Sequence, residues 1–164
     1  MLRLGTVLLL AGLCGCACRG YKIDLLPEPG MNRGVKDAVR VDLVWTTAEN
    51  SKKLEETSAH EWFENRMHDE DEYDGLVVTQ SVSPGEDKFT FPDAKVRPPK
   101  GYPVTGFVIY AFYEQPGEKD SQLRLVRNRK VPPLSTHCHL VLRLGDTTIE
   151  LDPGSPKKLW GLIQ

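Results

Sequence analysis

The chain has 164 residues with 21 basic and 23 acidic side chains, so it is close to electrically neutral. A nucleic-acid-binding protein needs a basic face that contacts phosphates, so this balance argues against that class and we expect no nucleic acid as a partner. The length suits one domain with its own hydrophobic core and is short for two.

The N-terminus combines a charged start, a short apolar run and a cluster of cysteines. The apolar segment 4–13 is too short to span a bilayer and has the length of a signal-peptide core. Leu13-Cys14-Gly15-Cys16 then resembles the lipobox of bacterial lipoproteins. We therefore expect residues 1–15 to be a lipoprotein signal peptide and Cys16 to carry the acyl chains, palmitate among them. An ordinary signal peptide with incidental cysteines is the alternative.

A lipid on Cys16 would fix the location of the protein, because two or more acyl chains hold a protein at a membrane without spanning it. Ala17, rather than Asp, follows the candidate anchor, and by resemblance to lipoprotein sorting rules this favours the outer membrane. We expect a domain anchored there on the periplasmic face. That oxidising compartment permits a disulfide between Cys18 and Cys138, but a buried free thiol at Cys138 is the favoured alternative.

Residues 16–37 are interpreted as the lipid tether followed by a first strand and a loop. The possible strand covers 21–26, and the loop 27–36 is rich in Gly and Pro. Apolar side chains then alternate, which predicts a half-buried strand over 38–46.

The segment 47–75 is the one region without a strand pattern. Ser58 and Glu61 fit a capping box, which predicts a helix over 58–67. Four apolar residues would share one face of this helix: Ala59, Trp62, Phe63 and Met67. The acidic run 69–74 resembles a calcium-binding loop, but the motif lacks its final Glu, so a solvated loop is favoured.

Six further strands are predicted after the helix. They cover 76–82, 88–91, 104–114, 122–127, 137–144 and 147–151. The apolar strand 104–114 is expected to be central, with Phe107, Ile109, Ala111 and Tyr113 on one face, Val108, Tyr110 and Phe112 on the other, and both faces covered. This spacing favours a β-sandwich over residues 38–152, with residues 153–164 as a C-terminal tail.

No sequence motif indicates catalysis, a metal or a cofactor. His137-Cys138-His139 is the one metal-like cluster, but neighbouring residues of a strand point to opposite faces, so the three side chains cannot converge on one ion. The nucleophile-elbow, phosphate-loop and zinc-peptidase motifs are missing from the sequence. We expect no enzyme activity, no catalytic residues, no metal and no cofactor. Trp62, Phe63 and Trp160 are expected to pack internally, with a partner contact as the alternative.

The order of these features resembles the outer-membrane lipoprotein family of the type VI secretion system, commonly called TssJ. The resemblance spans residues 16–151. It rests on the lipobox at Cys16, the strand 39–45, the helical insertion with Trp62 and Phe63, the segment 81–86 and the apolar strand 107–113. It implies an all-β, transthyretin-like β-sandwich of 7–8 strands with a short helical insertion.

The resemblance also implies a noncatalytic role, in which the protein holds the periplasmic part of the inner-membrane subunit TssM. In the family the loop between the first two strands carries much of this contact, and here that loop is 27–36. Its turn is expected to project an adaptable Met and hydrogen-bonding side chains. The candidate partner-binding residues are Pro29, Gly30, Met31, Asn32 and Arg33. The segment 47–75 is the competing surface. The alternative function is an envelope lipoprotein that binds a small ligand or carbohydrate on a concave face lined with aromatic side chains.

Overall fold

The computed structural model describes residues 22–34, 36–66, 73, 75–91, 99–114, 122–126, 139–153 and 161–163. The predicted signal peptide, Cys16, the possible pair Cys18 and Cys138, and Trp160 lie outside these residues, as do Met67 and most of the acidic run 69–74. Among the described residues, no helix is long and apolar enough to cross a membrane.

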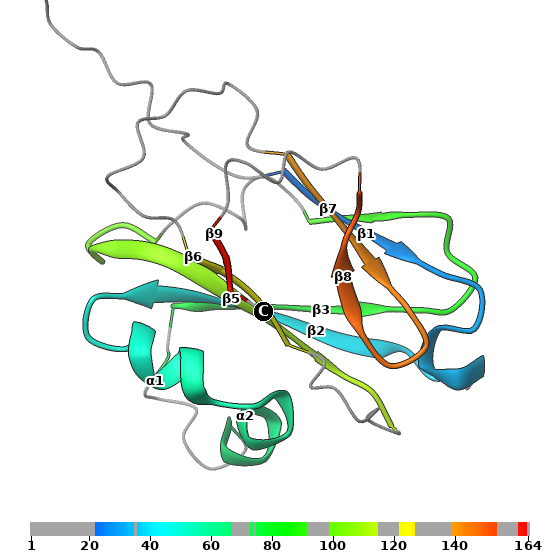
Figure 1. Cartoon of the computed structure of the whole chain (residues 1–164), viewed down its shortest axis with the longest axis horizontal. Helices are drawn as coiled ribbons and strands as arrows, with labels where there is room; N and C mark the ends of the chain where they lie inside the picture. The colour runs from blue at the N-terminus through cyan, green and yellow to red at the C-terminus, as the bar shows by residue number, and fades with distance from the viewer. Residues whose placement is uncertain are drawn as a thin grey trace, which may run out of the picture.

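Two β-sheets face each other in a sandwich, which confirms the all-β fold with a short helical insertion (Figure 1). One sheet has the order β4-β1-β7-β8. Its strands are β4 (Phe89–Thr90), β1 (Lys22–Pro27), β7 (His139–Leu144) and β8 (Ile149–Leu151). The other has the order β3-β2-β5-β6-β9. Its strands are β3 (Val77–Val82), β2 (Val39–Thr47), β5 (Val104–Phe112), β6 (Gln122–Val126) and β9 (Gly161–Ile163).

The strand count differs from the prediction by one. All eight predicted strands are present, and β9 is a ninth that pairs antiparallel with β6 within the segment interpreted as a tail. A three-residue strand is too short to show an alternating pattern, so its pairing depends on the neighbouring strand rather than on its own sequence.

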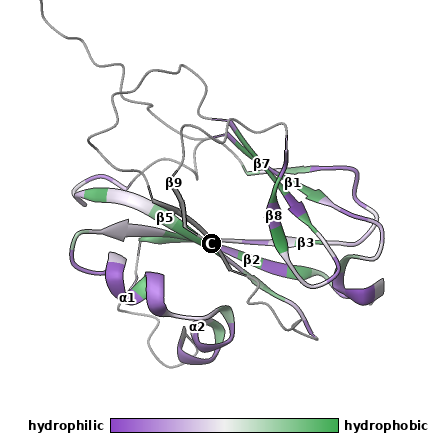
Figure 2. Ribbon diagram, viewed as in Figure 1, coloured by the Kyte–Doolittle hydropathy of each residue, from purple (hydrophilic) through white to green (hydrophobic). Residues whose placement is uncertain are grey.

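The main core lies between the two sheets and is made by alternate residues of the longest strands. Apolar side chains of β1 and β7 face those of β2 and β5. Its members at 1% exposure or less are Ile23, Leu25, Met31, Val39, Val41, Leu43, Trp45, Val82, Phe91, Phe107, Ile109, Ala111, Leu140, Leu142 and Leu144. The hydropathy colouring shows this alternation on β1, β7 and β8, where apolar and polar residues follow one another (Figure 2).

A second core lies on the outer face of the larger sheet, under two short helices. These are α1 (Ser51–Glu56) and α2 (Ala59–Arg66), and only α2 was predicted from the sequence. Leu54, Trp62 and Phe63 from the helices pack on Val108 and Tyr110 of β5. The capping box is confirmed: the Ser58 N–H donates to Glu61 Oε2 at 2.9 Å, and the Glu61 N–H donates to Ser58 Oγ at 3.2 Å.

A buried carboxylate fixes α2 on the sheet. Asp42, in the middle of β2, is fully buried and accepts hydrogen bonds from Trp62 Nε1 at 3.0 Å and from Thr79 Oγ1 at 2.7 Å. The Trp62 ring also stacks on Tyr110 at a centroid distance of 5.0 Å. These contacts explain why a strand with an acidic residue at its centre is buried on both faces.

One expectation for β5 is wrong. Phe107, Ile109, Ala111 and Tyr113 are buried between the sheets, and Val108 and Tyr110 are buried under the helices, as predicted. Phe112 was expected to be covered, but 47% of it is exposed. Helix α2 reaches Val108 and Tyr110 and does not extend over the last residue of the strand.

Candidate partner-binding site

The predicted contact loop contains a short turn, η1 (Met31–Gly34), which begins a few residues after the end of β1 at Pro27. Two of its non-glycine residues have left-handed backbones, Asn32 at φ 56° and Arg33 at φ 53°. This conformation costs roughly 1–2 kcal/mol per residue, so other contacts must hold the turn in place. The turn is therefore a fixed structure rather than a loose connector.

Met31 provides one of those contacts, and its predicted role is corrected. The side chain was expected to project toward a partner, but only 1% of it is exposed and it packs in the core between the sheets. A thioether chain with three rotatable bonds fills an irregular gap at the end of a sandwich well. Met31 thus holds the loop to the core.

Asn32 is likewise buried rather than projecting, with 3% exposed. Its Oδ1 accepts a hydrogen bond from the Glu114 N–H at 3.1 Å, and its Nδ2 donates to the Asp37 carbonyl at 3.4 Å. The amide therefore joins the turn to the residues that follow β5. Asn also tolerates the left-handed conformation better than most residues, which suits it to this position.

Three of the five candidate residues remain exposed: Pro29, Gly30 and Arg33. The Arg33 N–H donates to the Asp146 carbonyl at 3.2 Å, and its Nε lies 3.9 Å from Asp146 Oδ2. Asp146 belongs to the turn between β7 and β8, so the loop is also fixed to that turn. A partner can thus contact Arg33 and the Pro29–Gly30 backbone, while Met31 and Asn32 support them from below.

These contacts define one end of the sandwich, which we call the loop end. It comprises η1, the turn 145–148, the start of β2 at Val39, and Phe112 at the end of β5 with the two residues that follow it. The Tyr113 hydroxyl donates to the Thr148 carbonyl at 2.9 Å, and burial together with the charges of Glu28 and Asp146 raises the pKa of Tyr113. At the surface, a hydrogen bond to the Asp37 carboxylate, which favours the protonated form of Glu114, raises the pKa of Glu114.

The loop end carries an aromatic surface that sequence reasoning missed, and we call it the Phe112 patch: Phe112, Phe63 and Arg40. The Phe112 ring meets the Phe63 ring edge to face at 5.2 Å, and the Arg40 guanidinium lies 5.5 Å from the Phe63 centroid. Arg40 and Phe112 are cross-strand partners on β2 and β5. The pattern of alternating apolar residues did identify both strands, but it does not reveal where a covering helix stops.

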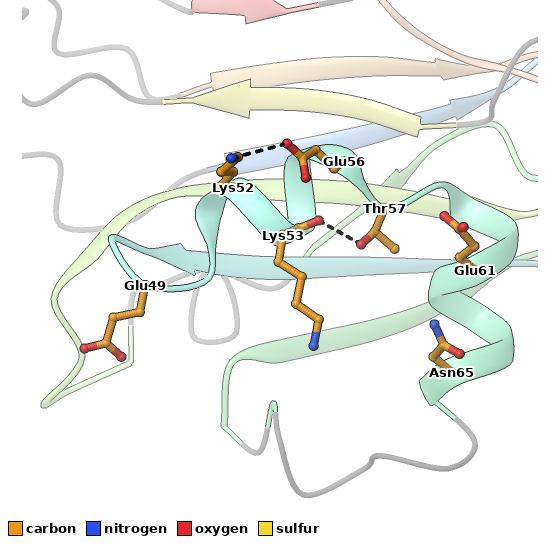
Figure 3. Close-up of a pocket in the computed structure, with 7 residues that line it drawn as sticks. All are labelled: Glu49, Lys52, Lys53, Glu56, Thr57, Glu61 and Asn65. Atoms are coloured by element: carbon orange, nitrogen blue, oxygen red, sulfur yellow. Dashed lines mark hydrogen bonds and ion pairs between the residues drawn. The ribbon is translucent and has the colours of Figure 1, made fainter.

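The competing surface, segment 47–75, presents a shallow depression between α1 and α2 (Figure 3). Its volume is about 550 Å³, and charged or polar side chains line it: Glu49, Lys52, Lys53, Glu56, Thr57, Glu61 and Asn65. Lys52 and Glu56 form an exposed pair at 4.0 Å. Mixed charges that are already paired on a wet surface contribute little to binding, so this depression offers no defined ligand chemistry.

Metal and carbohydrate binding were the other chemistries considered from the sequence, and His137 and Cys138 of the metal-like cluster lie outside the described residues. Within the described residues, no group of three or more His, Cys, Asp or Glu side chains is placed to hold a metal. Four aromatic side chains of the described residues, Trp45, Phe91, Phe107 and Tyr110, are buried in the two cores, whereas Phe112 is half exposed. They therefore do not line an open concave face of the kind that a carbohydrate would need.

The outer face of the smaller sheet carries one buried acid among basic groups. Asp24 accepts a hydrogen bond from Thr90 Oγ1 at 2.7 Å, and its Oδ2 lies 2.7 Å from His139 Nε2 and 3.3 Å from Lys88 Nζ. Burial raises the pKa of Asp24, but these partners outweigh burial and the net shift is downward. The cluster links β1, β4 and β7, so His139 has a structural partner in this sheet.

Comparison with known proteins finds similarity in structure only. No protein-family model and no curated protein sequence matches the chain. Solved structures do match with confidence, and three of them share the fold over most of both chains. A chain of a "Type VI membrane complex" has a TM-score of 0.56 at 15% identity, and the alignment covers 82% of this chain and 98% of that one.

The second is Serratia marcescens Lip, described as a membrane-bound component of the type VI secretion system, with a TM-score of 0.57, 10% identity, and coverage of 82% of this chain and 97% of Lip. The third is a chain in the structure of "T6SS protein TssM C-terminal domain (869-1107) from EAEC", with a TM-score of 0.52, 13% identity, and coverage of 80% and 99%. The chain has the TssJ-like fold. The resemblance seen in the sequence is thus confirmed at the level of the fold.

Proposed function

We propose that this protein is a noncatalytic, outer-membrane-anchored lipoprotein of the type VI secretion system. In this proposal it tethers the membrane complex by binding the periplasmic part of a TssM-like inner-membrane subunit. The observation that carries the proposal is the shared fold: the alignment takes in 97–98% of the chains of Lip and of a type VI membrane complex. This chain therefore aligns with almost the whole of each of those two chains.

The position of the candidate anchor is consistent with this role. Lys22 begins β1 shortly after Cys16 in the sequence, so at most about 20 Å of extended chain separates the lipid from the sandwich. Strand β1 then runs to Pro27, and η1 begins at Met31. The loop end lies at the opposite end of β1 from Lys22, where a periplasmic partner can approach the sandwich.

One of the structural neighbours supports the proposal that the partner is a TssM-like subunit. The alignment covers 80% of this chain and 99% of the matched chain, so the matched chain is shorter than this one. It is therefore also much shorter than residues 869–1107 of TssM, after which that structure is named. That sandwich-like chain occurs in a structure named for a TssM domain, and this favours a TssM-like partner for the present protein. The exposed Arg33 and the Pro29–Gly30 backbone are the proposed contacts within the loop.

The anchor is tested by replacing Cys16 with Ser in the full chain. We expect metabolic labelling with a palmitate analogue to label the natural protein and not the Cys16→Ser variant, and the outer-membrane fraction to lose the variant. Cys18→Ser is the matched control and should keep both the label and the location. A Cys16→Ser variant that is still labelled would contradict the assignment of the anchor.

A further inference from the structure

The turn η1 holds two successive non-glycine residues in a backbone conformation that glycine adopts without strain. Asn32 and Arg33 have φ values of 56° and 53°, and the glycines on either side, Gly30 and Gly34, have φ values of 91° and 75°. Strain at Asn32 and Arg33 persists only where the surrounding contacts determine the backbone. The contacts of these two residues therefore decide the shape of the turn.

Asn32 provides these contacts from inside the molecule. Its Nδ2 donates to the Asp37 carbonyl at 3.4 Å, and its Oδ1 accepts from the N–H of Glu114, which is 82 residues away in the sequence. Both partners are backbone groups, one shortly before β2 and one shortly after β5. Only 3% of Asn32 is exposed, so a partner protein cannot reach its amide directly. The amide joins the turn to both strands.

Arg33 is the residue whose position the turn decides. Its N–H donates to the Asp146 carbonyl at 3.2 Å, and 48% of its side chain is exposed. Its Nε lies 3.9 Å from Asp146 Oδ2, in a side chain that is 65% exposed. An exposed ion pair at this distance stabilises the fold by less than a left-handed backbone costs. The pair with Asp146 therefore does not explain an arginine where glycine would fit without strain.

A rigid turn beneath an exposed cation is well suited to binding. A loop that already has its bound shape loses less conformational entropy when a partner binds. A guanidinium also needs a defined direction in order to form paired hydrogen bonds with a carboxylate. The proposed contact at Arg33 therefore depends on the backbone of the turn, and this backbone depends on Asn32.

We infer that Asn32 is a positioning residue for the partner contact. It fixes the backbone of η1 and thereby presents Arg33 to a carboxylate on the TssM-like subunit, while its own amide does not touch the partner. This inference rests on the proposed function. It gives Asn32 an indirect role in place of the direct contact that was expected from the sequence.

A purely structural role for Asn32 makes a different prediction. Loss of the amide would then lower affinity only through lost stability, whatever residue occupies position 33. Positioning instead couples the two sites, because a variant that lacks Arg33 has no guanidinium left to misplace. A double-mutant cycle on Asn32 and Arg33 measures this coupling.

The test measures the Kd of the mature, acylated protein in nanodiscs for the purified periplasmic domain of the TssM-like subunit of the same organism. Asn32→Gly removes both amide bonds and still accepts the left-handed backbone, as does the Asn of Arg33→Asn. We expect each single variant to weaken binding about tenfold. The double variant should bind within about threefold of Arg33→Asn alone.

Gly34→Ala is a second variant, which disturbs the turn without touching the core. A Cβ at position 34 meets nothing within 4 Å, so alanine adds no clash and disfavours only the backbone at φ 75°. It should weaken binding of the natural protein and have much less effect in Arg33→Asn.

Two control variants should bind normally. Ser58→Ala lowers stability through the cap of α2, far from η1 in the sequence. Tyr102→Ser changes a side chain that is 46% exposed and lies just before β5, at the opposite end of that strand from the loop end.

The outcomes separate the inference from the proposed function. If the natural protein does not bind, the proposed partner is wrong and the inference falls with it. If the natural protein binds and Asn32→Gly binds equally well, the inference is overturned and the proposed function stands. Equal losses from Asn32→Gly with and without Arg33, or a loss of the same size in Ser58→Ala, would also overturn it. If Asn32→Gly does not fold, the two Gly34→Ala measurements decide in the same way.

Discussion

Ile109 and Phe112 are three residues apart on β5 and have opposite environments. Ile109 is fully buried between the sheets, whereas Phe112 is half exposed and has its ring contact with Phe63. Large-to-small changes at buried positions lose both burial and packing, while an exposed ring loses little more than its edge-to-face contact.

We therefore expect Ile109→Ala to lower the free energy of unfolding by about 2–5 kcal/mol and Phe112→Ala by about 0.5–1.5 kcal/mol. Urea denaturation monitored by tryptophan fluorescence measures both values. Equal losses in the two variants would contradict the environments that the structure assigns to these residues.

Asp24 is the residue that should make the free energy of unfolding depend on pH under acidic conditions. Its pKa in the folded protein lies below the ordinary value, so the folded state binds fewer protons than the unfolded state. The resulting stabilisation is complete above the unfolded pKa of about 3.9 and is lost as the pH falls through the lower folded value. Asp24→Asn should therefore lose less stability than the natural protein between about pH 5 and pH 2.

Thermal melts at a series of pH values measure this effect. Glu150→Gln, a change at an exposed acid on β8 of the same sheet, is the control and should follow the natural protein. If the melting temperature of Asp24→Asn falls with pH in parallel with that of the natural protein, the Asp24 cluster does not contribute to the acid dependence of stability.

Helix α2 is the element that shapes the candidate site, because it holds Phe63, whose ring contacts Phe112. Two features hold it in place: the capping box at Ser58 and Glu61, and the bond from Trp62 to buried Asp42. The Ser58 bonds also lower the pKa of Glu61. Helix α1 lacks a side-chain cap at its N-terminal residue, Asn50.

Loss of the Ser58 hydroxyl should therefore destabilise mainly α2. We expect Ser58→Ala to destabilise the protein by about 0.5–2 kcal/mol and to speed amide hydrogen exchange in α2. Ser51→Ala, at the start of α1, is the matched control and should change stability by less than about 0.5 kcal/mol. Equal effects of the two substitutions would argue against the capping box as a source of stability.

At the scale of the whole molecule, the sequence predicts features that depend on neighbouring residues. The alternation in β2, the apolar run in β5 and the Ser58–Glu61 spacing are local, and each predicted element is present. Features that depend on distant residues were missed. Asp24 is buried by Thr90 and His139, which lie 66 and 115 residues away in the sequence.

The errors at the site have the same origin. A Gly- and Pro-rich turn carries no periodicity, so nothing near Met31 in the sequence indicates that its side chain enters the core. Phe112 continues the apolar alternation of β5, and only the position of α2 decides that it stays uncovered. Helix α1 is polar apart from Leu54, which leaves too weak a pattern for a helix to be predicted.

The central claim is that the loop end contacts a TssM-like subunit while a lipid on Cys16 anchors the protein to the outer membrane. Photocrosslinking in intact cells tests it most directly, with a photoreactive amino acid placed at Arg33, Phe112 or Tyr102 of the full-length protein. We expect crosslinks to the TssM-like subunit, identified by mass spectrometry, from positions 33 and 112 and not from position 102. Crosslinks from position 102 alone, or none from any of the three while the subunit is present, would contradict the account.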